Sequence, residues 1–451
     1  MGRSVESPDK PTRLVKRLLT LWALFPVLAF AGPADFPKPA ALVPQVEFWK
    51  KVFAEWSERQ VVVHDNLYLN KIYGVIDLRE IDDDNERWHE RHRREKAELI
   101  AVDRALANLA KGGYSAEDLQ GREREIWTLF KDIDDPRKFT KARERVRTQQ
   151  GLKERFRRGL EISRRYLPMM EETFREVGLP TELTRLPFVE SSFNINAYSK
   201  VGAAGIWQFI PSSARIYLQF NEIEDSRRDP LYATIGAARH LRDDYEALGK
   251  WPLAVTAYNH GRAGIAKAVE KLGSDDIVDI IKHYNGKSFG FASRNFYTEF
   301  LAAVEVERDY KKFFGEVDFE RKMEFHEVQI DDYLRFSTIA GLAHCSVDDL
   351  HDLNPGFTNA VVDDKLYVPK NYTVRIPAAS YQKFDAAYAS LPADERFSRQ
   401  RAYFVVHKVT RGQTIDGIAK RYRTTVSAIQ VANGLRQKRI RTGQTLKIPT
   451  G

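Results

Sequence analysis

The sequence predicts a mainly α-helical fold, with smaller modules toward the C-terminus. Apolar residues recur at helical spacing through residues 160–312. The clearest stripe consists of Leu231, Ile235, Ala238, Leu241, Tyr245 and Leu248. Prolines in predicted first turns (Pro211, Pro230) and glycines after predicted last turns (Gly249, Gly261) mark the helix ends. Because 451 residues are too many for one core, two to four domains are expected.

Beyond Phe314 the chain contains a weak internal repeat. Four matches recur at an offset of 79 residues, one of them a pair of adjacent residues, and an Ile-Pro pair recurs at an offset of 72 residues. The matched positions are Ile339-Ala340 with Ile418-Ala419, Val347 with Val426, Leu350 with Ile429, Asn354 with Asn433, and Ile376-Pro377 with Ile448-Pro449. Such offsets indicate duplicated modules. Thr414 and Thr425 fit as helix N-caps in the second copy.

The region before residue 160 is predicted to be largely helical. An amphipathic helix is expected over residues 44–57, and a second one lies within the charged residues 82–166. The apolar face of this second helix consists of Leu99, Val102, Leu106 and Leu109. Residues 61–63 and 68–76 are expected to be extended. We assign no function to this region from its sequence.

The first residues predict export from the cytoplasm. Basic residues precede the apolar run Leu18–Phe30, and Ala29-Phe30-Ala31 has the small-residue pattern of a cleavage site. Residues 1–31 are therefore interpreted as a signal peptide, because the run covers only about 20 Å of helix. A retained membrane anchor is the alternative. A periplasmic or envelope location follows, without a stable membrane span and without a cysteine near residue 31 for lipid attachment.

Composition excludes some function classes. Hydrophobic residues make up 43% and charged residues 30%, as in soluble globular proteins. The net charge of +8 suggests nucleic acid as a partner, but export argues against it. No nucleic acid is therefore expected, and an acidic envelope polymer or a solvated helix face fits the clustered charge better. Cys345 is the lone cysteine, which precludes an intrachain disulfide.

The stretch from Glu182 to Ile210 contains the strongest candidate for chemistry. Glu190 stands among Phe188, Val189 and Phe193, an apolar setting that disfavours the charged carboxylate. Such a glutamic acid can keep its proton near neutral pH and act as a general acid. The alternative is a half-buried residue that caps a turn or pairs with Arg185.

Three further pieces follow Glu190-Ser191 in order. Gly205-Ile206-Trp207-Gln208 combines a loop glycine with Gln208, and Trp207 offers a flat face on which a sugar ring could stack. Ala257-Tyr258-Asn259 closes a helical stretch, and Tyr297 lies on a later predicted helix.

Together these pieces resemble the signature of the goose-lysozyme-like lytic transglycosylases, which cleave peptidoglycan. Within that family the chain is most similar to the membrane-bound lytic transglycosylase D type. The resemblance implies a lysozyme-like all-helical domain over residues 160–314, with Glu190 as the catalytic residue. It also implies that Ser191, Ser199, Gln208, Tyr258, Asn259 and Tyr297 bind the substrate.

The resemblance also implies the reaction. The linkage between N-acetylmuramic acid and N-acetylglucosamine would be cleaved, by exo or endo action, with formation of 1,6-anhydromuramoyl ends. One carboxyl group suffices for this reaction, whereas most glycoside hydrolases need two. Asp225, Asp229 and Glu299 are available, but their spacing recommends none of them as a partner. Two alternatives remain: a goose-type hydrolytic lysozyme and a non-enzymatic peptidoglycan-binding protein.

The second C-terminal copy, residues 402–450, resembles a LysM module, a small α+β unit that binds N-acetylglucosamine polymers. The first copy, residues 320–378, would be a degenerate LysM-like module, with a linker over 379–401 and a helical N-terminal region over 32–159. A monomer that binds peptidoglycan glycan strands is expected. His89 and His92 lie about one turn apart, but no ligand cluster completes a zinc site, so neither metal nor other cofactor is expected.

Overall fold

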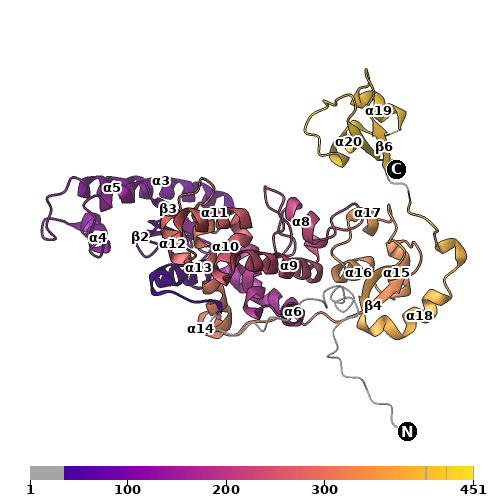
Figure 1. Ribbon diagram of the computed structural model, residues 1–451, viewed down its shortest axis with the longest axis horizontal. Coiled ribbons are helices and arrows are strands. Elements are labelled where there is room, and N and C mark those ends of the chain that lie inside the picture. The colour runs from indigo at the N-terminus through magenta and orange to yellow at the C-terminus, as the bar shows by residue number, and fades with distance from the viewer. Residues whose placement is uncertain (1–34, 402–403, 423, 450–451) are drawn as a thin grey trace, which may run out of the picture. The chain divides into compact units, whose positions relative to one another are not determined.

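The computed structural model describes residues 35–401, 404–422 and 424–449. The predicted signal peptide lies outside these residues. Within them the chain forms two compact units, and the mainly helical fold class is confirmed (Figure 1). The larger unit takes its described residues from the stretch up to Leu218 and from Pro230–Lys322. The smaller contains Gln219–Asp229 and the residues from Met323 onward.

The first part of the larger unit is a helical region built around a three-stranded antiparallel sheet in the order β2-β1-β3. Its elements are η2 (Ala40–Leu42), α2 (Val43–Ala54), β1 (Gln60–Asp65), β2 (Ile72–Asp77), α3 (Asp84–Leu109), α4 (Gly121–Leu129), α5 (Lys138–Arg143) and β3 (Val146–Gln150). The predicted apolar face of α3 packs on the sheet, with Val102 and Leu106 fully buried. Strand β3 falls where the sequence predicted helix. Its backbone pairs with β1, which lies about 80 residues earlier in the chain, and this long-range pairing decides its conformation.

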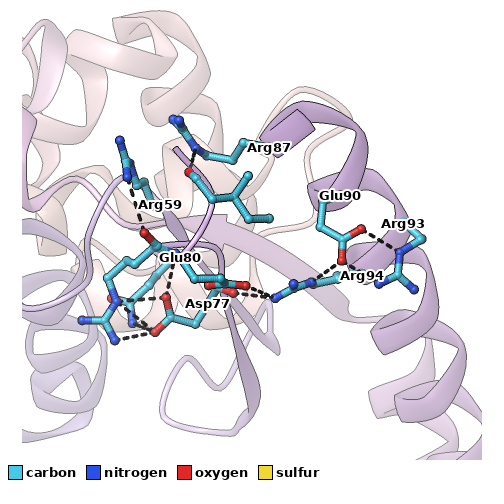
Figure 2. A network of polar contacts seen from close by, with 10 residues as sticks. Arg59, Asp77, Glu80, Arg87, Glu90, Arg93 and Arg94 are labelled. Atoms are coloured by element: carbon cyan, nitrogen blue, oxygen red, sulfur yellow. Dashed lines mark hydrogen bonds and ion pairs between the residues drawn. The ribbon is translucent and has the colours of Figure 1, made fainter. Parts of the chain in front are cut away.

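A polar network fastens the start of α3 to the end of β2 (Figure 2). Arg94 of α3 donates to the carbonyl of Asp77 at 2.8 Å and pairs with Glu80 at 2.7 Å. Glu90, which lies between His89 and His92 in sequence, forms ion pairs with Arg93 and Arg94. His92 instead packs against the ring of Trp88, with centroids 4.1 Å apart.

The helical core of the larger unit follows. Its elements are α6 (Lys153–Glu176), η3 (Thr181–Arg185), α7 (Leu186–Glu190), α8 (Pro211–Tyr217), α9 (Pro230–Leu248), α10 (Trp251–His260), α11 (Arg262–Leu272), α12 (Ile277–His283), α13 (Phe291–Arg308) and α14 (Tyr310–Phe314). Pro211 and Pro230 begin α8 and α9 as predicted, and Gly261 ends α10 with a φ of 93°. The helix α13 contacts α2, α7 and α10, so it lies between the N-terminal region and the predicted site.

The N-terminal helix α2 is joined to α13 by polar contacts as well as by packing. The indole nitrogen of Trp49 donates to Asn295 at 3.3 Å, and Lys50 pairs with Glu305 at 3.1 Å. The sequence analysis assigned no function to α2. The structure shows that α2 holds α13, the helix that packs against α7 with Glu190.

The two C-terminal modules share one plan. The first consists of β4 (Phe325–Ile330), α15 (Phe336–Leu342), α16 (Val347–Leu353), α17 (Asn359–Val362) and β5 (Tyr372–Pro377), followed by η5 (Ala378–Ser380), α18 (Tyr381–Ala389) and η6 (Ala393–Glu395). The second consists of β6 (Phe404–Lys408), α19 (Ile415–Arg421), α20 (Val426–Ala432) and β7 (Thr445–Pro449). In each, two antiparallel strands enclose helices.

The matched asparagines explain the repeat. Asn354 donates to the carbonyls of Leu350 and Arg375 and accepts from the amide of Arg375. Asn433 makes the same three contacts, with Ile429 and Lys447. The side chain thus ties the second helix to the last strand in both copies.

The first module differs from its predicted boundaries in two ways. Phe384 of α18 is fully buried in the module core, so residues expected to form a linker belong to the fold. The segment Gln219–Asp229, which contains η4 (Ser226–Arg228), lies between α8 and α9 in sequence but belongs to the same compact unit as the module. The amide of Asp225 donates to the carbonyl of Gly356 at 2.7 Å, and Asp229 forms a buried ion pair with Arg375.

Candidate active site around Glu190

Glu190 is the last residue of α7, a short helix that begins directly after η3 with Pro187 in its first turn. Ser192 and Phe193, which follow Ser191, have φ values of 52° and 57°. This left-handed backbone is unfavourable for side chains other than glycine and is often found at functional sites. Gly159 of α6 permits the sharp turn, because an added Cβ would meet the carbonyl oxygen of Ser192 at 2.8 Å.

The carboxyl group of Glu190 has no polar partner among the residues that the structure describes. Its neighbours in the turn, Phe188 and Phe193, are buried and pack edge to face. Arg185, the partner suggested by the simpler interpretation, pairs with Glu171 and Glu307 instead. Burial raises the pKa of Glu190 from 4.5 to about 8, so the group keeps its proton at neutral pH.

The loop after Glu190 is held against it by Ser191. The Ser191 hydroxyl donates to the carbonyl of Ile206 at 2.9 Å. The Gln208 side-chain amide donates to the carbonyl of Gly205 at 2.8 Å, and Gln208 itself has a φ of 49°. Ser199 accepts the amide of Ala203 at 3.0 Å. Three of the predicted site residues therefore shape this loop.

Tyr258 of α10 reaches the same place. Its hydroxyl donates to the carbonyl of Trp207 at 2.9 Å. Burial raises the pKa of Tyr258, and the charge of Glu190 adds to this effect, which places the two side chains within electrostatic reach of each other. The adjacent Asn259 is exposed, and its side-chain oxygen accepts from Ser293 of α13 at 2.9 Å.

Two aromatic residues do not lie where the sequence suggested. Trp207 is fully buried, stacks on Phe174 and donates to Thr234 at 2.9 Å, so the expectation of a sugar-stacking face is wrong. Tyr297 is also fully buried, and its hydroxyl donates to the carbonyl of Pro37 at 2.7 Å. The structure therefore does not bring Tyr297 together with the other candidates.

A second carboxyl group lies near Glu190. The charge of Glu190 raises the pKa of Glu299 on α13, after the larger effect of burial, to about 8. Asp225 is paired with Arg227, and Asp229 with Arg375, so these two are engaged elsewhere. No sequence signal marked Glu299, because it stands 109 residues after Glu190 and outside the matched motifs.

Within the described ranges, no group of three or more His, Cys, Asp or Glu side chains could hold a metal ion. No helix of the described chain is long and apolar enough to cross a membrane. Cys345 is half-buried beside the core of the first module.

Comparison with known families agrees with this geometry. Residues 170–281 match the transglycosylase SLT domain. The chain carries a transglycosylase SLT domain. Residues 407–449 match the LysM domain, and residues 324–393 match the LysM-like domain of lytic transglycosylase MltD. The SLT match contains Glu190, Ser191, Ser199, Gln208, Tyr258 and Asn259, and it ends before α13.

The chain is also similar to known proteins over a longer stretch than the SLT match. The chain is homologous to membrane-bound lytic murein transglycosylase D from two Escherichia coli strains, with 27% identity over 303 residues in each case. The match covers 63% of this chain and 64% of each relative, so the chain spans somewhat less than two thirds of their length. The 70 kDa soluble lytic transglycosylase from Escherichia coli is a structural match with a TM-score of 0.27 and 18% identity, covering 50% of this chain and 37% of that one.

Proposed function

We propose that this protein is a peptidoglycan lytic transglycosylase in which Glu190 acts first as an acid and then as a base. The observation that carries the proposal is the carboxyl group of Glu190, which lies within the SLT match, has no polar partner among the described residues and has its pKa raised by desolvation. The LysM domains and the name of the homologous enzyme support a murein substrate.

The proton balance of the reaction fits a single carboxyl group. Glu190 gives its proton to the glycosidic oxygen, and the bond from this oxygen to C1 of N-acetylmuramic acid breaks. The Glu190 carboxylate then takes the proton of the muramic 6-hydroxyl as that oxygen bonds to C1. The product is a 1,6-anhydro sugar, the proton returns to Glu190, and no water is consumed. General acid and base catalysis of this kind contributes about 10²- to 10⁴-fold.

Hydrolysis is the competing reaction, and Glu299 is the group that it would require. A base that activates water must be ionised, whereas the pKa of Glu299 is raised to about 8. At neutral pH Glu299 is therefore mostly protonated, and only a minority of molecules would have it ionised and ready to accept a proton from water. This favours attack by the sugar hydroxyl over attack by water.

Residues 1–31 and the LysM domain suggest where the enzyme works. We propose export by the predicted signal peptide and retention at the envelope by binding to glycan strands. Ser191, Ser199, Gln208, Tyr258 and Asn259 remain candidate substrate-binding residues in this scheme.

The proposal is tested by comparing the wild-type protein with Glu190→Gln on purified sacculi. The amide keeps the shape of the side chain but has no proton to give, so soluble products are expected from the wild type only. Mass spectrometry of those products should find anhydromuramoyl ends. Normal turnover by a folded Glu190→Gln variant would refute the proposal.

A further inference from the structure

Arg147 on strand β3 is a cation that the proposed reaction does not use. Its guanidinium carbon lies 3.9 Å from the centre of the Phe291 ring, at the start of α13. In the described part of the chain this guanidinium makes no hydrogen bond or ion pair. Its neighbour on the chain, Arg145, is by contrast paired with Asp65 at 2.8 Å. Arg147 is also exposed as a residue, while partial burial of its guanidinium lowers the pKa of the group.

The Phe291 ring, which Arg147 contacts, packs against two buried aromatic side chains. His64 of β1 is fully buried, its ring centre lies 5.9 Å from that of Phe291, and Trp49 packs on the same ring at 6.1 Å. Burial lowers the pKa of His64 to about 4, so this side chain stays neutral. Arg147 therefore rests on a rigid, uncharged platform made by the N-terminal region and α13.

Glu299 connects this platform to Glu190. The two carboxyl groups project from α13 and α7, which pack against each other, and in the described residues neither has a hydrogen-bond or ion-pair partner. Arg147 and Glu190 both lie close enough to act electrostatically on Glu299: the charge of Glu190 raises the pKa of Glu299 and that of Arg147 lowers it. Because the pKa of Glu299 is raised to about 8, the group is uncharged at neutral pH and leaves the charge of Arg147 uncompensated.

We infer that Arg147 and Glu299 form a carboxylate-binding subsite beside Glu190, through which the N-terminal region takes part directly in substrate recognition. The inference rests on the proposed function, because each muramic acid of peptidoglycan bears a carboxylate on its lactyl group or on its stem peptide. Arg147 would donate charge-assisted hydrogen bonds to that carboxylate. Protonated Glu299 would donate one more.

Several other charged groups around α13 are already engaged. Tyr258 on α10 and Glu190 on α7 are the titratable groups on the site side. Lys50 of α2 is paired with Glu305 and Glu47, Arg185 of η3 with Glu307, and Lys311 of α14 with Glu316, while His260 of α10 lies beside Ser293. The elements packed against α13 also carry Lys51, Glu182, Tyr310 and Lys312. Glu299 and Glu190 are therefore the groups whose titration should change the charge at the subsite near pH 8.

The first test compares the full-length wild type with Arg147→Met and Arg147→Lys on three soluble glycan-strand substrates. One substrate keeps its stem peptides, the second has lost them to an amidase and bears free lactyl carboxylates, and the third has all its carboxylates converted to amides. Methionine can still pack on Phe291, and Arg143→Met, at an exposed pair with Asp103, is the matched control. KM and kcat are measured separately, and thermal unfolding checks each fold.

For Arg147→Met we expect KM to rise about fivefold with little change in kcat, the size of a partly exposed charge contact. Arg147→Lys should recover part of the loss, and Arg143→Met should behave like the wild type. A rise on the peptide-bearing strands alone identifies the stem peptide as the source of the carboxylate, and a rise on the amidase-treated strands alone identifies the lactyl group. An equal rise on the amidated strands, or no rise on any strand, would overturn the inference.

The second test concerns Glu299. As the pH rises from about 7 to about 9, Glu299 ionises, pairs with Arg147 and repels the bound carboxylate, so the wild-type KM should increase. Glu299→Gln should show a smaller increase in KM over this range, because only Glu190 still ionises beside the subsite. A parallel KM profile for both proteins would contradict the inference. Glu190→Gln separates the proposed reaction from the proposed subsite. Full activity of Glu190→Gln would refute the reaction. If Glu190→Gln is inactive and the KM of Arg147→Met is unchanged, only the subsite is refuted.

Discussion

At the scale of the residue, the proton on Glu190 should set the upper pH limit of activity. Burial raises its pKa to about 8, and only the protonated form can give a proton to the glycosidic oxygen. We therefore expect the rate of muropeptide release to persist at neutral pH and to fall as the pH rises through about 8. Initial rates in buffers from acidic to alkaline pH, with circular dichroism as the control for folding, measure this. A rate that continues to rise well above pH 8 would contradict the assignment.

The same burial should cost stability. The pKa of Glu190 is 4.5 ordinarily and about 8 in the folded protein, so between these values the unfolded chain releases a proton that the folded chain keeps. Stability therefore falls as the pH rises through that window. Glu190→Gln lacks this titration and should have the higher Tm at pH 8, with the advantage shrinking at acidic pH. Each kcal/mol gained should raise Tm by about 2–4 °C.

Differential scanning calorimetry at several pH values measures that difference. Glu171→Gln is the control, because it removes a partner of buried Arg185 and should gain no stability. If Glu190→Gln were less stable than the wild type at pH 8, the glutamate would have an unrecognised favourable partner.

Some residues of the site could be predicted and others could not. Glu190, Ser191 and Gln208 stand close together in sequence, and local turns bring them together. Whether an aromatic side chain faces substrate or core depends on helices far away in sequence, which is why Trp207 was misjudged. Glu299 and Arg147 are brought toward Glu190 only by the packing of α13 against α7 and the N-terminal sheet.

At the scale of the element, the two matched asparagines provide an internal comparison. Asn354 is buried, so Asn354→Ala removes three buried hydrogen bonds, two of them to the backbone of Arg375. We expect this to cost about 2–3 kcal/mol. Asn433 is less buried, and water can replace its bonds, so Asn433→Ala should cost about 1 kcal/mol. Chemical unfolding of the full chain tests the order, and an equal loss at both positions would contradict it.

The ion pair of Asp229 and Arg375 should be essential to the smaller unit. Both side chains are almost fully buried, so Arg375→Met removes the cation that faces the Asp229 carboxylate in the interior, at a cost of about 3–5 kcal/mol. Arg335→Met, at a half-exposed pair with Glu395, is the matched control and should cost at most about 1 kcal/mol. Similar Tm values for the two variants would show that the buried pair is dispensable.

Elements with local signals were predicted well. Thr414 and Thr425 cap α19 and α20 by accepting the amides of Gly417 and Ala428. Strand β3 had no such signal, because pairing with β1 at long range decides its conformation. The same holds for Gln219–Asp229, whose partners in the first module lie more than a hundred residues further along the chain.

At the scale of the whole molecule, catalysis and retention on the polymer should be separable. Removing Arg401–Gly451 deletes the LysM domain and leaves the SLT domain complete. We expect the truncated protein to be retained poorly on insoluble peptidoglycan and to cleave short soluble glycans at nearly the normal rate, because the module raises only the local concentration. Co-sedimentation with sacculi measures retention. Equal sedimentation of both proteins would mean that the module has a structural role alone.

The central claim is that the muramic 6-hydroxyl, and not water, attacks C1 after Glu190 has given up its proton. Digestion of sacculi in oxygen-18-enriched water, followed by mass spectrometry of the new sugar ends, tests it most directly. The account predicts anhydromuramoyl ends that contain no heavy oxygen, at neutral pH and with wild-type protein. New reducing ends that each carry one atom of heavy oxygen would contradict it.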